Sequence, residues 1–218
     1  WSMTGGTRST IDQATGRLVV KDGGAITVTA TSGSLSDSWT FTVEPKPVTA
    51  VVTAASKPYD GGDTATLTVT ISNGLVPGDV ITPGSVTARG HFADASVGES
   101  KTVVIDGLTI PAEVSAKYDI SWPSMTTASI TPKAANVTEE PKAVTGPLTY
   151  NGGAQALLAS GGTAEGGDLM YSLDSRDYSY SIPEVTDAGT YTIWYKAAAA
   201  DENHKDSAAV KLGPVTID

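Results

Sequence analysis

The sequence YDGG at residues 59–62 returns as YNGG at residues 150–153, and these two stretches indicate how the chain folds. Asp-Gly and Asn-Gly are the strongest short signals for a β-hairpin turn, because both positions accept a positive φ angle. The tyrosine before each pair is expected to cap the edge of a core. We therefore interpret both stretches as turns rather than ligand sites, and their repetition predicts two copies of one β unit.

Two further signals recur in the same order as the turns. VGESKTV at residues 97–103 returns as AGTYTI at residues 188–193, and GDVI at residues 78–81 returns as GDLM at residues 167–170. The offset is nearly constant, so the chain is expected to be a tandem array of small β domains. Arrays of this kind commonly serve as stalks or binding modules.

Composition and charge exclude several classes of function. The 218 residues suffice for two or three small domains, and with 39% apolar and 6% aromatic residues each core must be thin. The net charge of −10 opposes binding to nucleic acid and to an anionic membrane surface. No window reaches the length of a membrane span, so no membrane insertion is expected. Cysteine is absent, which favours an exported bacterial chain over an animal ectodomain.

Alternation of apolar and polar residues is the dominant local pattern. Tyr191, Ile193 and Tyr195 occupy one face of a strand, and the segment at residues 64–71 alternates apolar residues with threonine. Four alanines at residues 197–200 favour helix, but no apolar stripe follows them, so we expect a loop or a single helical turn there. Further strands are expected near residues 17–20, 25–31, 38–43, 48–54, 85–92, 101–106, 117–122, 127–131, 168–174 and 210–217.

Two segments rich in proline and charge are interpreted as linkers. EPKP at residues 44–47 and TPK at residues 131–133 divide the chain into domains at 1–45, 46–132 and 133–218. Short proline-containing linkers restrict pivoting, so the sequence predicts an elongated, semi-rigid rod. The first domain is half as long as the others and is expected to be the C-terminal half of a sandwich cut from a longer chain. It would be frayed, packed on its neighbour or completed by a second chain.

Three segments carry a resemblance to known families. Residues 15–43 resemble the C-terminal half of group 2 bacterial Ig-like domains. The middle unit, with KPYDG at residues 57–61 and PGD at 77–79, resembles the YDG repeat of bacterial surface proteins. The last unit, with LTYNG at 148–152 and DAGTY at 187–191, is similar to Ig-like repeats of large gut-bacterial surface proteins. These resemblances imply an exported, modular adhesin or its stalk, and no shared catalytic residues.

The sequence therefore predicts an all-β chain of tandem Ig-like β-sandwiches, with β-grasp-like units as the structural alternative. The predicted function is a spacer or stalk segment of a secreted, adhesin-like protein on the bacterial cell surface, monomeric within a longer chain. The alternative is a binding module that recognises a host protein or glycan through the last domain or a groove between domains. We expect no enzymatic activity, no cofactor and no metal.

Tyrosines of the last unit form the one candidate binding site. Tyr178 and Tyr180 lie in the polar, hairpin-like stretch at residues 174–181, where exposed rings could stack on sugars or anchor a protein partner. The alternative is that both rings cover the end of the domain. Tyr191 follows a turn, and its hydroxyl is predicted to bond backwards and fix a corner of the fold.

Histidines and acidic residues offer two weaker possibilities. His91, in a predicted strand, and His204, in a predicted loop, are the only histidines and fall in different domains, so a shared metal site is not expected. The stretch DENHKD at residues 201–206 offers oxygen ligands for calcium. It lacks the spacing and glycine of a known calcium loop, so we interpret it as a solvated loop.

Overall fold

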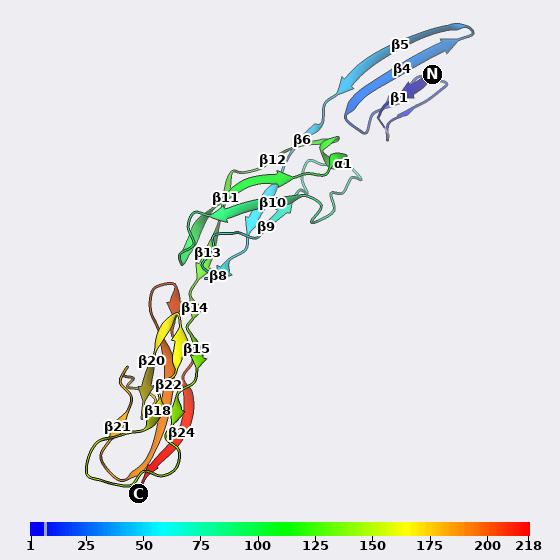
Figure 1. Cartoon of the computed structure of the whole chain (residues 1–218). Coiled ribbons are helices and arrows are strands. Elements are labelled where there is room, and N and C mark those ends of the chain that lie inside the picture. Colours follow the sequence, from blue (N-terminus) through cyan, green and yellow to red (C-terminus); the bar gives the residue numbers. More distant parts are fainter. Residues whose placement is uncertain (7) are drawn as a thin grey trace. The chain divides into compact units, whose positions relative to one another are not determined.

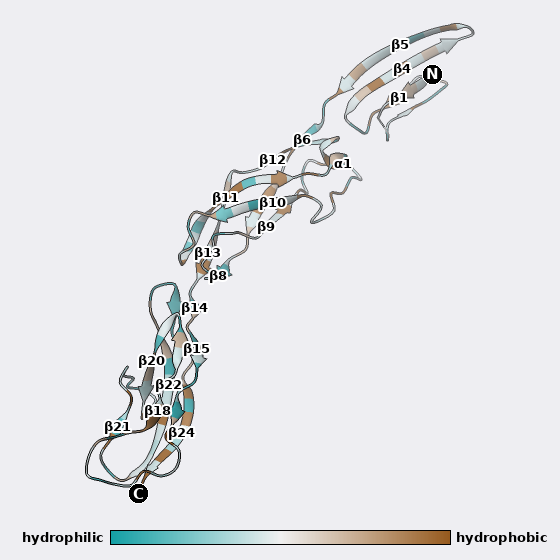
Figure 2. Cartoon of the chain, in the orientation of Figure 1, coloured by the Kyte–Doolittle hydropathy of each residue, from teal (hydrophilic) through white to brown (hydrophobic). Residues whose placement is uncertain are grey.

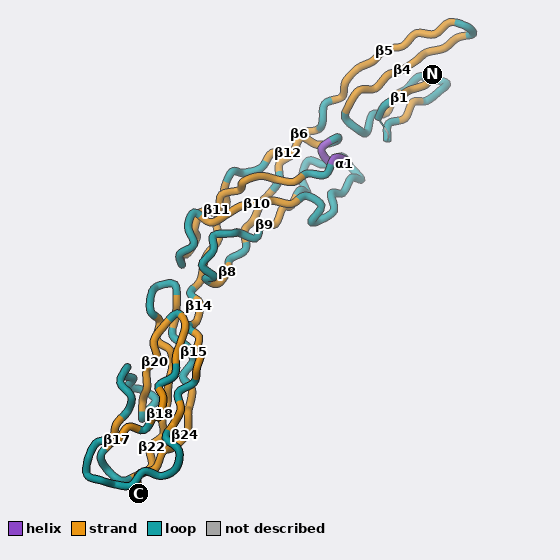
Figure 3. Tube along the Cα trace, viewed as in Figure 1, coloured by secondary structure: helices purple, strands orange, loops and turns teal. Residues whose placement is uncertain are grey.

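The structure, a computed structural model, describes residues 1–6 and 8–218, and they are almost entirely β (Figures 1 and 3). In this part of the chain the single helix is α1 (Ala112–Ser115). The prediction of an all-β fold is therefore confirmed. The described residues divide into two compact units. Residues 1–55, 63–94 and 100–128 form unit 1, and residues 56–62, 95–99 and 129–218 form unit 2.

Unit 1 begins with a three-stranded antiparallel sheet. Its order is β1-β4-β5, formed by β1 (Ser2–Thr4), β4 (Gly24–Ser32) and β5 (Leu35–Val43). Ile26 of β4 is fully buried, whereas Trp39 of β5 is 67% exposed and stacks on Phe41 with 4.8 Å between ring centroids. The rest of unit 1 thus leaves Trp39 largely uncovered, and the half-sandwich interpretation stays a prediction.

Two of the other strand pairs of unit 1 contribute to a second core. β6 (Lys46–Thr49) pairs in parallel with β12 (Tyr118–Ser121), and β7 (Val51–Ala54) pairs antiparallel with β9 (Leu67–Thr70). The strands alternate as predicted, since Ala65 and Ile71 are buried and the threonines between them are exposed. The core consists of Val48, Ala50, Ile71, Val86, Val114, Tyr118 and Ile120.

Unit 2 contains a three-stranded antiparallel sheet with the order β20-β22-β24. Its strands are β20 (Gly167–Ser172), β22 (Gly189–Ala199) and β24 (Val210–Ile217). Ile193 and Tyr195 of β22 are buried, as the alternation predicted. The core also includes Ala135, Leu157, Leu158, Leu169, Tyr171, Ala197, Val215 and Ile217.

The other strands are mostly short. They are β2 (Thr10–Ile11), β3 (Leu18–Val19), β8 (Lys57–Pro58), β10 (Thr87–Phe92), β11 (Gly98–Thr109), β13 (Met125–Thr131), β14 (Lys133–Ala134), β15 (Asn136–Glu139), β16 (Lys142–Ala143), β17 (Gln155–Ala156), β18 (Leu158–Ser160), β19 (Thr163–Glu165), β21 (Glu184–Val185) and β23 (His204–Lys205). Strands lie at every place where the sequence predicted one. Figure 2 shows hydrophobic and hydrophilic residues interspersed along them, as expected for strands with one face buried.

The backbone shows one pattern of hydrogen bonds twice, in the two segments that the sequence aligned. Where each copy opens, the N–H of Lys46 donates to the carbonyl of Lys117 over 2.8 Å, and that of Lys133 to Asn203 over 3.0 Å. At the end of the last strand of the first of these copies, the carbonyl of Thr131 accepts the N–H of Tyr59 over 2.8 Å. In the same way Tyr150 donates to Asp218 over 2.7 Å. The long strands β11 and β22 both begin at the glycines that the sequence aligned.

The two YDGG-like stretches are turns, but the hairpin interpretation was wrong. Gly61 and Gly152 have φ angles of +78° and +75°, and in each turn the side chain of Asp60 or Asn151 accepts the N–H two residues later over 2.9 Å. The strand before the first turn, β8, pairs in parallel with β13 rather than with a strand directly after the turn. A turn signal fixes the local backbone and leaves the pairing partner undetermined.

Three other predictions are corrected by the structure. The linker interpretation was wrong for Lys46 and Pro47, which form part of β6, and for Lys133, which begins β14. Gly78 lies in a loop turn whereas Gly167 begins β20, so the third repeated signal does not mark equivalent places. The alanines at residues 197–199 end β22 instead of forming a loop or helical turn, because their small side chains fit a buried strand.

Candidate functional site

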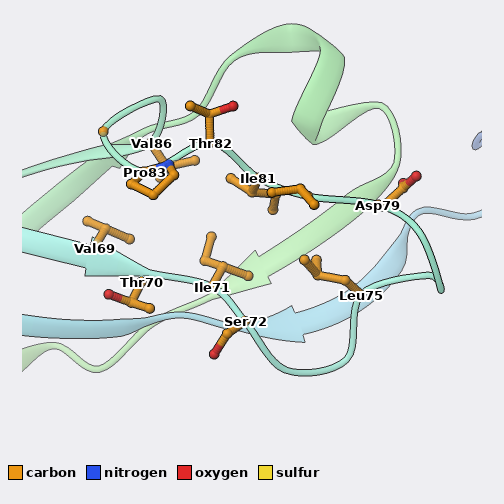
Figure 4. A pocket seen from close by; sticks show the side chains of 12 residues that line it. Val69, Thr70, Ile71, Ser72, Leu75, Asp79, Ile81, Thr82, Pro83 and Val86 are labelled. Atoms are coloured by element: carbon orange, nitrogen blue, oxygen red, sulfur yellow. The ribbon is translucent and has the colours of Figure 1, made fainter.

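An apolar pocket of about 330 Å³ lies in unit 1. One wall comes from the end of β9, and the other comes from the loop at residues 72–86. Figure 4 shows Ile71, Leu75 and Ile81 converging on this space, while Thr70 and Ser72 point to the other side of the strand. Gly78 and Gly84, with φ angles of +88° and +82°, let the loop curve around the pocket.

Asp79, at the edge of this pocket, holds the loop in place. Its carboxylate accepts hydrogen bonds of 2.9 Å from Arg8 and from the hydroxyl of Tyr118, and Lys117 lies 3.8 Å away. The Tyr118 hydroxyl also accepts the N–H of Val76 over 3.0 Å. The bonds from Arg8 and Tyr118 lower the pKa of Asp79 despite its burial, and burial raises the pKa of Tyr118.

This network gives Asp79 a structural role. The carboxylate is charged and already bound by three neighbours, so it is not poised to take a proton from a ligand. The pocket can therefore accommodate a small apolar group, and its lining offers no paired nucleophile and base. The sequence motif at this place, GDVI at residues 78–81, indicated a turn. It did not predict the cavity, because the cavity walls come together only when the chain folds.

The two tyrosines of the predicted site in unit 2 have different surroundings. Tyr178 is half-buried, and the ammonium of Lys196 lies 4.9 Å from the centre of its ring, within the range of a cation–π contact. Tyr180 is 62% exposed and lines a surface hollow with Thr163, Asp168 and Tyr171. The hairpin-like stretch is present, since Tyr171 and Ser179 exchange main-chain hydrogen bonds of 2.8 and 2.9 Å. Tyr180 remains the candidate for ligand contact.

The loop that carries these tyrosines is shaped by Asp174. Its carboxylate accepts the N–H groups of Arg176 and Asp177 over 2.9 Å and the Ser172 hydroxyl over 2.8 Å, while Ser175 adopts a φ of +65°. These bonds, led by the N–H of Arg176, lower the pKa of Asp174 from 3.8 to about 2. Three donors directed at one carboxylate stabilise its ionised form.

Asp174 is therefore expected to make unit 2 sensitive to acid. Because the folded pKa of about 2 is below the ordinary 3.8, its stabilising effect is complete above pH 3.8 and is lost as the pH falls through 2. Urea unfolding measured between pH 2 and pH 5 should show this loss. Asp174→Asn, which keeps an oxygen to accept the N–H groups, should flatten that part of the profile. Identical profiles for the two proteins would contradict the assignment.

Tyr191 forms the corner that the sequence predicted. Its hydroxyl donates to the carbonyl of Asp187 over 2.8 Å, four residues back along the chain. This bond closes the turn from which β22 begins. The hydrogen bond stabilises the turn, and Ala188 within the turn is exposed at the surface.

Tyr191→Phe is expected to lower the free energy of unfolding of unit 2 by about 0.5–1.5 kcal/mol, the usual net value of one hydrogen bond. The ring stays, so packing is unchanged and only the bond to Asp187 is lost. Chemical unfolding followed by circular dichroism would measure the difference. A loss near zero would show that the hydroxyl contributes nothing to the corner.

His91 lies apart from His204 and the acidic stretch that contains it, and these residues bond to neighbouring protein groups. His91 belongs to β10 in unit 1, as predicted, and lies 3.2 Å from Asp106. His204 belongs to β23 in unit 2 rather than to a loop, which corrects its prediction. Asp206 accepts bonds from Lys196 over 2.6 Å and from the Ala199 N–H over 3.0 Å. Within the described residues, no group of three or more His, Cys, Asp or Glu side chains is placed to hold a metal.

Comparison with known proteins identifies the middle of the chain. Residues 44–128 match the YDG domain, which confirms a YDG-type repeat in the segment where the sequence indicated one. No curated protein and no solved structure matches the chain. The bacterial Ig-like resemblances of the other segments stay predictions. No helix found in residues 1–6 and 8–218 is both long and apolar enough to cross a membrane.

Proposed function

We propose that this chain is a structural spacer segment of a secreted, adhesin-like protein on the bacterial cell surface, built from Ig-like sandwiches and without catalytic activity. The repeated backbone pairing is the observation that carries the proposal. In each copy the opening strand pairs in parallel with a late strand, β6 with β12 and β14 with β23. Each copy therefore closes on itself, and serial copies add length without sharing strands.

Two further observations support a role without catalysis. Three of the carboxylates with lowered pKa values illustrate this, since donors from the protein itself bind them: Asp79 is bound by Arg8, Asp174 by main-chain N–H groups, and Asp206 by Lys196. Catalytic acids and bases commonly have pKa values displaced toward neutrality, and these are displaced away from it. The YDG match adds support for a modular repeat.

Small-angle scattering with in-line mass determination tests the spacer. The full chain should have the mass of a monomer, 22.3 kDa, and the profile of a single elongated particle. An elongated monomer is what serial copies with short connections produce. A compact particle would contradict the proposal, and a dimeric mass would show instead that a second chain completes the open first sheet.

A second candidate function is recognition of a host protein or glycan through Tyr180. The exposed ring borders a hollow that also contains the polar side chains of Thr163 and Asp168. A flat ring beside hydrogen-bonding groups is suited to stack on a sugar. Binding of the full chain to immobilised glycans should be lost in Tyr180→Ala and kept in Trp39→Ala, an exposed aromatic residue of unit 1. Equal binding by both variants would exclude this surface.

A further inference from the structure

One end of the YDG-matched segment is occupied by a turn from elsewhere in unit 2. Val97 donates its N–H to the side-chain oxygen of Asn203 over 2.9 Å. The ring of Tyr59 meets the ring of His204 edge to face, with 5.4 Å between centroids and an angle of 79° between planes. A polar bond and an aromatic contact thus fix the turn at residues 201–205 against this end.

The turn is built to present these two side chains. Asp201 accepts the N–H of Asn203 over 2.9 Å and lies 2.7 Å from Nδ1 of His204. The imidazole also covers Gly166, where a Cβ atom would lie 2.7 Å from Nε2. His204 and Asn203 are therefore held in position by the body of the repeat, so little conformational freedom is lost when they make contact.

The same end of the next copy carries equivalent groups and is open. Tyr150 corresponds to Tyr59, because each donates its N–H to a carbonyl at the end of a late strand, that of Asp218 directly after β24 and that of Thr131 at the end of β13. Ala188 corresponds to Val97, since each directly precedes the glycine that begins the long strand. Tyr59 is half-buried, but Tyr150 is 53% exposed and Ala188 is also exposed.

We propose that Tyr150 and Ala188 form a docking surface for a further β repeat of the same class as residues 133–218. The partner would present a turn with the chemistry of Asp201–His204, an asparagine that accepts the Ala188 N–H and a histidine ring that meets Tyr150 edge to face. A second copy of this whole chain does not fit, because Tyr59 and Val97 already occupy its turn. The inference rests on the proposed spacer function and identifies the contact through which copies join.

The test is a fused protein in which a second copy of residues 132–218 follows Asp218 of the full chain. Amide hydrogen exchange should slow about tenfold at Ala188 relative to the unfused chain, the effect of one added hydrogen bond. Asn203→Ala in the added copy should restore fast exchange at Ala188. The matched control, Asn203→Ala in the original copy, should instead speed exchange at Val97 and leave Ala188 protected.

Two outcomes would overturn the docking surface. Ala188 could exchange equally fast in the fused and unfused proteins although the added copy is folded, as judged by protection of its own β22 amides. The added copy could also fail to fold at this position, which would show that the surface does not accept such a repeat. Either result leaves the spacer proposal standing if the original chain is an elongated monomer in solution, whereas a compact particle overturns the spacer by itself.

Discussion

Ile193→Ala should lower the free energy of unfolding of unit 2 by about 2–5 kcal/mol. Ile193 is fully buried in β22, the middle strand of its sheet, and packs in the same core as Leu157 and Ile217. Truncation removes buried apolar surface and leaves a cavity that neighbouring strands cannot fill without distorting their pairing. Urea unfolding followed by circular dichroism would show the transition of unit 2 at a lower midpoint.

Val210→Ala is the matched control for this substitution. Val210 lies in β24 of the same sheet but is 41% exposed, so its truncation should cost less than about 1 kcal/mol. A similar loss at both positions would show that the core of unit 2 does not lie between these strands and the segment at Leu157. A large loss at Ile193 alone would establish which face of the sheet is buried.

Gly162→Ala should destabilise unit 2 by about 2–5 kcal/mol, for two separate reasons. Gly162 has a φ of +76°, a conformation that costs an alanine about 1–2 kcal/mol. A Cβ atom there would also collide with the carbonyl oxygen of Glu139 and lie 2.8 Å from the nitrogen of Pro141. Backbone atoms cannot move aside as a flexible side chain could, so the connection between β18 and β19 would have to shift.

Gly146→Ala separates these two reasons. Its φ of +81° is nearly the same, but no atom lies within 4 Å of the position of its Cβ atom. It should therefore cost only about 1–2 kcal/mol, the strain of the backbone conformation. Thermal unfolding of both variants would give the cost of the close approach by difference. Equal losses would mean that the backbone around Glu139 yields freely.

The fold could be predicted from the sequence where a pattern is local. Alternation located the strands, and the glycines at Gly98 and Gly189 marked the starts of β11 and β22. The parallel pairing of Lys46 and Pro47 in β6 could not be read, because its partner β12 is 72 residues away. The alanines at residues 197–199 were misread because tertiary packing overrides helix propensity. Their strand approaches its neighbour closely, since a Cβ atom at Gly167 would collide with the main chain of Ala198.

The candidate sites were less predictable than the fold. Tyr191 was predicted correctly, because its bond to Asp187 depends on a short turn that the sequence specifies. The sequence did not distinguish Tyr178 from Tyr180, but in the structure Tyr178 is half-buried and contacts Lys196, whereas Tyr180 is exposed. The pocket beside Asp79 depends on Arg8 and Tyr118, which lie far from the loop in the sequence. Contacts of this kind have no local signal.

The parallel pairing of β6 with β12 is expected to slow the folding of the copy that contains them. Thr49 and Ser121 share a hydrogen bond of 3.1 Å across 72 residues, so chain entropy must be lost before this contact can form. During synthesis β6 has no partner until residues 118–121 have emerged, and β14, the opening strand of the next copy, follows soon afterwards at residue 133. Exchange of strands between neighbouring repeats is a common route to misfolding. The two opening strands differ in sequence, KPVT in β6 and KA in β14, and we expect this difference to disfavour such exchange.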